Sequence, residues 1–268
     1  MEEIDLNNWE TFEEKLKIIE NEHIKKGYSD KFLYRGQGNH IHSLKTTLER
    51  NGRECLSLKE YHHLIFMVRP QIESFTRVNW DVLLNPYDFN DLLKKSSYWV
   101  FHSREFQSAY SYMTYLRHYG FPSPLLDWTR SPYVAAFFAF RNASNCGEKV
   151  SIYVYSEMPS GLKSSSPNEP HICKLGPYVK TDRRHFVQQS QYTICVVNDN
   201  EWRYAPHEEA FAHPNPNQDV LWKINIPFSE RLKVLKILDG YNINALSLLG
   251  SDESLMETMA LRVIDLKD

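Results

Sequence analysis

The chain has 268 residues, of which 42% are hydrophobic and 24% are charged, so it is long and apolar enough to bury a substantial core. Its net charge of −3 excludes a general attraction to polyanions, and nucleic-acid binding would therefore need a local basic patch. An acidic N-terminus and the absence of an apolar run of about 20 residues predict a cytoplasmic protein without a membrane span.

No linker or internal repeat divides the sequence, and the run 156–170 is short enough for a surface loop. We therefore expect one domain over 1–268. The four cysteines have no Cys-x-x-Cys spacing, which predicts reduced structural thiols rather than a disulfide framework. They are Cys55, Cys146, Cys173 and Cys195.

The first half of the chain is predicted to be rich in helices. An amphipathic helix in 1–30 is expected to open at Asn7 or Asn8 and to close at Gly27. Apolar residues at helical spacing predict further helices over 53–75 and 88–118, where Trp99 is one of the periodic aromatics. These two make up a helical insertion over 53–118.

The stretch 32–38 is predicted to be a short apolar strand that ends at Arg35 and runs into a glycine-flanked turn. Gly36 and Gly38 flank Gln37 and would let the backbone approach a ligand closely. The Arg35 guanidinium offers a planar fork for phosphate or carboxylate oxygens. A structural ion pair explains this arginine equally well from the sequence alone.

The segment 117–141 is the centre of the pattern. Its first part, 117–131, reads as a polar loop with buried leucines, and Ser131 followed by Pro132 reads as an N-cap and first helical residue. The helix over 132–141 is apolar on several faces and is predicted to be interior. Polar side chains at its mouth suggest a site, and a capped core helix that binds nothing is the alternative.

The second half of the chain is predicted to be rich in strands. Apolar β-formers predict strands over 149–155, 189–197 and 219–226 within a strand-rich part, 149–249. A helical pattern follows over 229–238, ending at Gly240. The stretch 243–249 comes next, and a closing helix is predicted over about 252–261 within the segment 250–268. Helices first and strands later predict an α+β fold.

No metal site is expected. The histidine pair His62 and His63 would point in different directions on a helix, and His40 with His42 has no further ligand at a familiar spacing.

Several motifs together resemble the FRG domain family, named for its Phe/Tyr-Arg-Gly motif. The resemblance runs from about Phe32 to Leu249 and rests on these residues: Tyr34–Gln37, Arg50, His118–Gly120 with Pro122, Leu125–Thr129, Ala135, Phe138, Ala139, Arg184, Gln188 and Tyr192. The chain departs from the family pattern at Arg117, at Ser123 and Pro124, and at Ser190. The change at Pro124 removes an arginine, for which Arg117 or Arg130 could substitute.

A looser resemblance links the order of these motifs to ADP-ribosyltransferases. It implies an ADP-ribosyltransferase-like mixed β core and NAD as substrate. In that scheme Arg35 grips the dinucleotide, while Thr129 and Ser131 support the nicotinamide-ribose pocket. Gln188, or the nearby Gln189 or Gln191, takes the place of the usual glutamate. The resemblance implies NAD contacts from Tyr34, Arg35, Gly36, Gln37, Thr129, Ser131 and Phe138.

Nicotinamide–ribose cleavage passes through an oxocarbenium-like transition state, which a held pyrophosphate and nearby oxygens stabilise. A neutral glutamine cannot act as general base, so another carboxylate or an already nucleophilic acceptor is required. The candidate carboxylates are Asp127, Glu201, Glu208 and Glu209. His118 could accept a proton or bind phosphate, or it and Asp127 could only bond to each other and fix the loop.

Three functions remain open. The leading one is an NAD-dependent ADP-ribosyltransferase, expected as an intracellular toxin or anti-phage effector that modifies a protein or nucleic acid. The second is a catalytically silent module that binds a nucleotide or partner. The third is a nucleotide hydrolase using His118 with Asp127. A basic run, Lys180, Arg183, Arg184 and His185, hints at nucleic acid and is equally well explained as a solvated loop.

Overall fold

The computed structural model is a mixed α+β protein, which confirms the predicted class. None of the helices that it describes is long and apolar enough to cross a bilayer. The described residues are 1–28, 32–54, 56–80, 84–95, 101, 103–142, 147–157, 166, 168–176, 179, 181–212 and 219–267.

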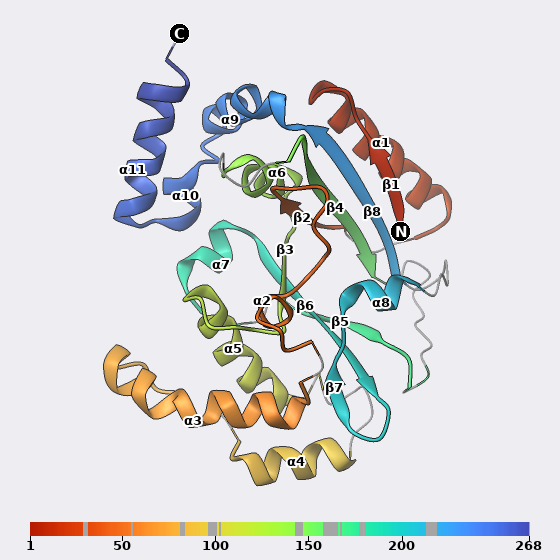
Figure 1. Ribbon diagram of the computed structural model, residues 1–268, viewed down its shortest axis with the longest axis vertical. Coiled ribbons are helices and arrows are strands. Elements are labelled where there is room, and N and C mark those ends of the chain that lie inside the picture. Colours follow the sequence, from red (N-terminus) through yellow and green to blue (C-terminus); the bar gives the residue numbers. More distant parts are fainter. Residues whose placement is uncertain are drawn as a thin grey trace.

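One sheet of eight strands runs through the molecule (Figure 1). Its order is β1-β8-β4-β2-β3-β6-β5, and β7 pairs with β6. All pairs are antiparallel except that of β1 with β8. The strands are β1 (Glu2–Asp5), β2 (Leu33–Gln37), β3 (Leu126–Thr129), β4 (Lys149–Glu157), β5 (His171–Leu175), β6 (Ser190–Asn198), β7 (Trp202–Tyr204) and β8 (Asp219–Pro227).

Several helices lie toward the two ends of the long axis, and others lie between them (Figure 1). Helices α3 and α4 lie at one end, and α1, α9 and α11 lie at the other (Figure 1). The α-helices are α1 (Glu10–Lys25), α2 (Thr47–Arg50), α3 (Leu58–Thr76), α4 (Pro86–Lys95), α5 (Arg104–His118), α6 (Pro132–Phe140), α7 (Arg183–Val187), α8 (His207–Ala212), α9 (Arg231–Gly240), α10 (Ala245–Leu249) and α11 (Asp252–Ala260). A 3-10 turn, Phe228–Glu230, precedes α9, and a π-helical turn, Leu261–Asp265, follows α11.

The central strands are buried on both faces. On β4, Ile152 and Val154 belong to the core that includes α1, α6 and α9, whereas Tyr153 and Tyr155 belong to a second core. This alternation is the period of two that a strand imposes on its side chains. Helix α6 is interior as predicted, with six of its residues buried: Val134, Ala135, Ala136, Phe137, Ala139 and Phe140.

The predicted polar loop over 117–131 is wrong in one part, because Leu126–Thr129 forms strand β3. This strand lies between β2 and β6 and pairs with both. Four residues are too few for a clear alternating pattern, and the pairing partners lie far away in the sequence. The same reason explains why β1, β5 and β7 were not predicted, and α2 and α8 are similarly short.

The other predicted elements are found with small shifts of their ends. The expected Ser131 cap is confirmed, because the Val134 N–H donates to its hydroxyl at 3.3 Å. Asn8 accepts from the Thr11 N–H, and Gly27 follows α1 with φ of +75°. The pattern over 88–118 corresponds to two helices, α4 and α5, and Trp99 lies outside the described residues, as does most of the run 156–170.

The described cysteines, Cys173 and Cys195, are buried and are not joined in a disulfide, as expected. Cys55 and Cys146 lie outside the described residues.

His62 is a core residue. Its ring stacks on Phe89 with centroids 3.8 Å apart, and both ring nitrogens are buried without a hydrogen-bond partner. Desolvation lowers the pKa of His62 to about 4, with a smaller contribution from the charge of the neighbouring His63. The unfolded chain therefore takes up this proton first as the pH falls, and the folded state loses stability below about pH 6.5.

We expect His62→Phe to flatten the acid dependence of stability. From pH 7.5 to pH 5 the wild type should lose about 2 kcal/mol more unfolding free energy than the variant. Urea denaturation at both pH values measures this difference. His63→Gln is the matched control, because His63 is exposed and should keep the wild-type slope. An unchanged slope in His62→Phe would contradict the assignment.

Candidate functional site

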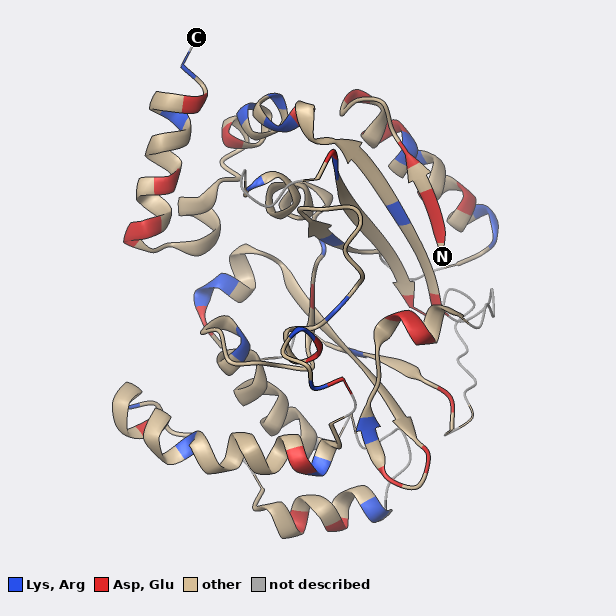
Figure 2. Cartoon of the chain, in the orientation of Figure 1, with Lys and Arg blue, Asp and Glu red and all other residues tan. Residues whose placement is uncertain are grey.

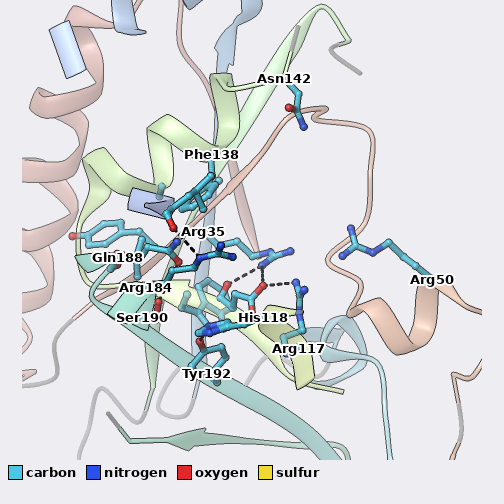
Figure 3. A pocket seen from close by; sticks show the side chains of 17 residues that line it. Arg35, Arg50, Arg117, His118, Phe138, Asn142, Arg184, Gln188, Ser190 and Tyr192 are labelled. Carbon is cyan, nitrogen blue, oxygen red and sulfur yellow. Dashed lines mark hydrogen bonds and ion pairs between the residues drawn. The ribbon is translucent and has the colours of Figure 1, made fainter. Parts of the chain in front are cut away.

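A cavity of about 460 Å³ opens where β2, β3 and the start of β6 meet α6. Figure 3 shows its side chains converging from these strands and from α2, α5 and α7. Its lining consists of Tyr34, Arg35, Gly36, Arg50, Arg117, His118, Asp127, Trp128, Thr129, Ala135, Phe138, Asn142, Arg184, Gln188, Ser190, Tyr192 and Leu249.

Arg35 lies in the middle of β2 rather than at its end, and its side chain crosses to β3. Its Nη1 donates to the backbone carbonyl of Asp127 at 2.8 Å and lies 3.8 Å from the Asp127 carboxylate. Desolvation lowers the pKa of Arg35 to about 10, and the Asp127 charge opposes this shift. The guanidinium is thus charged at neutral pH and is both a structural ion-pair partner and a cavity wall.

Asp127 is shared between two guanidinium groups, because Arg117 also pairs with its carboxylate. The Nε atoms of Arg35 and Arg117 are enclosed, and among the described residues neither has a hydrogen-bond partner. Other parts of both side chains line the cavity. Their positive charge therefore favours an anionic ligand in the cavity.

His118 contacts Tyr192 and does not form the hydrogen bond with Asp127 that the sequence analysis considered. The His118 Nε2 atom lies 2.6 Å from the Tyr192 hydroxyl, and its buried Nδ1 has no partner. Desolvation lowers the pKa of His118, although the Asp127 charge opposes it, and burial raises the pKa of Tyr192. Both groups are therefore neutral at pH 7.

The second and third motif positions meet at the opposite wall. The Thr129 hydroxyl donates to the Gln188 carbonyl at 2.6 Å. The Gln188 side-chain amide donates to the Leu248 carbonyl at 3.0 Å. The Ser190 hydroxyl lies 3.5 Å from the Gln188 side-chain oxygen. These contacts orient the Gln188 amide oxygen toward Ser190, which lines the cavity.

The glycine of the Tyr-Arg-Gly motif is required for packing. A Cβ on Gly36 would lie 1.8 Å from the Ala135 carbonyl oxygen and 2.6 Å from the Ala139 nitrogen. On the side where a Cβ would stand, the close neighbour is thus the backbone of α6, and Gly36 also lines the cavity. At Gly38 the nearest atom would be 3.5 Å away, an ordinary contact.

Some predicted residues do not line the cavity. The Gln37 amide donates to the His42 and Ser43 carbonyls, and the Ser131 hydroxyl caps α6. Gln189 is exposed and Gln191 is buried in the sheet, so Gln188 is the glutamine that faces the cavity. Glu201, Glu208 and Glu209 are also outside the lining. Of the candidate carboxylates, Asp127 lines the cavity.

The arginines of the lining were only partly foreseen. Arg117 and Arg130 were the two candidates to replace the arginine that the chain lacks at Pro124. Arg117 lines the cavity, whereas Arg130 is exposed and outside the lining. Arg184 enters from α7 and its Nε donates to the Leu249 carbonyl at 3.0 Å. Arg50 enters from α2. Arg50 and Arg184 belong to two separate motifs of the family resemblance. The sequence does not indicate that both side chains point into one cavity.

The basic run near α7 does not act as one patch. Arg183 is exposed, Arg184 lines the cavity, and His185 is buried and stacked on Tyr192 with centroids 5.9 Å apart. Lys180 lies outside the described residues. Figure 2 shows basic positions in α2, α5 and α7 near the middle of the molecule, around strand β3.

The lining has a strong positive charge. Four arginines, Arg35, Arg50, Arg117 and Arg184, face one carboxylate, Asp127, which gives a net charge of +4 − 1 = +3. Among the described residues, no group of three or more His, Cys, Asp or Glu side chains could hold a metal ion. The arrangement is suited to binding anions through guanidinium groups and neutral donors.

In a comparison with protein families, residues 30–147 match the model of the FRG domain. The matched region contains β2, α2, β3 and α6, and it excludes Arg184, Gln188 and Tyr192. Neither the curated proteins nor the solved structures include a match to the chain.

Proposed function

This chain contains an FRG domain in residues 30–147, and from that premise we propose that its arginine-lined cavity binds a nucleotide through the phosphate groups. The observation that carries the proposal is the convergence of four guanidinium groups on one cavity. Arg35, Arg50, Arg117 and Arg184 line it together with Asp127, the carboxylate of the lining. Phosphate oxygens would accept hydrogen bonds from guanidinium groups and offset the net charge of the lining.

The remaining lining suits the rest of a nucleotide. Phe138 and Leu249 offer apolar surface for a base, while Thr129, Ser190 and Asn142 offer polar groups for a ribose. A volume of about 460 Å³ lies within the usual range of small-molecule sites.

The test is to measure binding of ADP-ribose by isothermal titration calorimetry at low salt. We expect the wild type to bind and Arg35→Ala to lose at least about tenfold in affinity, because the variant loses charge-assisted hydrogen bonds. Arg130→Ala is the matched control, since Arg130 is exposed and adjacent in sequence to β3 but outside the lining. Absence of binding to the wild type, or equal binding to Arg35→Ala, would contradict the proposal.

A second candidate function is ADP-ribosyl transfer from NAD on an ADP-ribosyltransferase-like fold. The convergence of three motif residues favours it. Arg35, Thr129 and Gln188 line one cavity although they lie far apart in the sequence. Asp127 and the oriented Gln188 oxygen would then stabilise the developing positive charge on the ribose. The structure gives no dyad of His118 with Asp127, and so it does not favour a nucleotide hydrolase that depends on one.

Nicotinamide release from NAD tests this second candidate, with and without a cell lysate as a source of acceptors. Release that Arg35→Ala abolishes and Arg130→Ala retains would support transfer. Binding of NAD without release in any condition would leave the nucleotide-binding proposal standing and would overturn the transferase.

A further inference from the structure

The cavity has two unlike ends. In Figure 3, Phe138, Gln188, Arg184 and Ser190 gather at one end, and Arg50 approaches from the opposite side, beyond Arg117. The first end is where the apolar surface and the amide lie. The second end is cationic, so a bound nucleotide would place its base and phosphates in a defined direction.

Arg50 differs from the other arginines of the lining because the described part of the chain offers its guanidinium no acceptor. Arg35 and Arg117 share the Asp127 carboxylate, and Arg184 donates to the Leu249 carbonyl. Among the described residues, the Arg50 side chain makes neither a hydrogen bond nor an ion pair. Arg50 as a whole residue is exposed, and its side chain lines the cavity. Desolvation lowers the pKa of Arg50, and the charge of Arg117 lowers it further.

The backbone that carries Arg50 is firmly positioned. Helix α2 begins with a capping box between Thr46 and Glu49. The Leu48 N–H donates to the Ser123 carbonyl at 3.1 Å, and the Ser123 N–H donates to the Thr47 hydroxyl at 2.9 Å. These contacts attach α2 to the segment that leads into β3. Two like charges, those of Arg50 and Arg117, are thereby held at the same end of the cavity.

The charge count indicates which phosphate chemistry this end requires. The lining carries +3, whereas a diphosphate esterified at both ends, as in ADP-ribose or NAD, carries about −2 near neutral pH. About one positive charge then remains unmatched, and Arg50 is the guanidinium without a protein acceptor. A phosphomonoester adds the missing negative charge together with further acceptor oxygens.

We propose that Arg50 and Arg117 form a phosphomonoester subsite, so that the cavity prefers nucleotides with a free phosphate group over those whose phosphates are all esterified twice. This inference rests on the proposed nucleotide binding. The free phosphate has two possible sources: the terminal phosphate of a nucleoside diphosphate, or a 2′-phosphate on a dinucleotide.

Two matched ligand pairs test the subsite and distinguish the sources. ADP and ADP-ribose differ in whether the β-phosphate is free, and NADP and NAD differ by the 2′-phosphate. Calorimetry with the full chain should give about tenfold tighter binding to the phosphomonoester member of at least one pair, as one charge-assisted contact predicts. In Arg50→Gln that preference should fall to within about twofold.

The control is Arg53→Gln, because Arg53 is an exposed arginine three residues away and outside the lining. It should retain the wild-type preference. Equal binding within both pairs by the wild type, or an undiminished preference in Arg50→Gln, would overturn the subsite while leaving nucleotide binding intact. Absence of binding by all four ligands would overturn both proposals.

Discussion

Replacement of Gly36 by alanine is expected to prevent normal folding or to lower the free energy of unfolding by at least about 3 kcal/mol. The new methyl group would overlap the Ala135 carbonyl oxygen, at 1.8 Å, and approach the Ala139 nitrogen. Both atoms belong to the backbone of α6, which cannot rotate away as a flexible side chain can. Helix α6 would have to move off β2, and the buried core between them would open.

Urea denaturation followed by circular dichroism measures this effect. Gly38→Ala is the matched control, because its methyl group would meet its nearest neighbour at 3.5 Å, and it should change stability by no more than about 1 kcal/mol. If the two variants proved equally stable, the close packing of β2 against α6 would be refuted. A folded Gly36→Ala protein that had lost only ligand binding would instead restore the ligand-approach role for this glycine.

Replacement of Asp127 by asparagine is expected to lower stability and raise phosphate affinity at the same time. The variant keeps the backbone carbonyl that accepts from Arg35 but removes the carboxylate that Arg35 and Arg117 share. The net charge of the lining rises from +3 to +4. Since the Asp127 side chain is 36% exposed, we expect a loss of about 1–2 kcal/mol, less than for a fully buried pair.

The affinity for pyrophosphate should increase about fivefold in Asp127→Asn, because one nearby repulsive charge is removed. Thermal unfolding at low salt, with and without pyrophosphate, measures both effects: a lower Tm without ligand and a larger rise with it. Asp199→Asn is the control, since it removes an ion pair with Arg203 outside the cavity. A Tm and a pyrophosphate response equal to those of the wild type would show that Asp127 does not set the charge of the site.

The same variant separates the two candidate functions. In a binding module, Asp127→Asn would only bind phosphates more tightly. In a transferase, it would bind NAD at least as well and yet release less nicotinamide, because it lacks the negative charge that favours the oxocarbenium-like transition state. Affinity and turnover would then change in opposite directions, a result that misfolding cannot produce.

The basic run near α7 and the acceptor of a transferase concern regions other than the cavity. The side chains of Arg183, Arg184 and His185 diverge into solvent, cavity and core respectively. Their proximity in the sequence therefore does not translate into a common surface for nucleic acid. The acceptor in the transferase candidate remains to be sought by the lysate experiment.

Local signals in the sequence were sufficient for the longer elements. The Ser131–Pro132 start of α6, the apolar strands β4, β6 and β8, and the α+β class depend on periodicity and capping within short windows. Short motifs, among them Tyr34–Gln37 and Leu125–Thr129, likewise suggested the FRG domain, whose model matches residues 30–147. Strand β3 was not foreseen, because its four residues are stabilised by β2 and β6, which are distant along the chain.

The sequence by itself determined which residue types could form a site, and only the tertiary structure decided how they are combined. Asp127 pairs with Arg117 and Arg35 rather than with His118, and His118 contacts Tyr192. Arg50 and Arg184 reach the same cavity from two short helices more than a hundred residues apart. Side-chain partners depend on the spatial arrangement of strands and helices, which local periodicity does not encode.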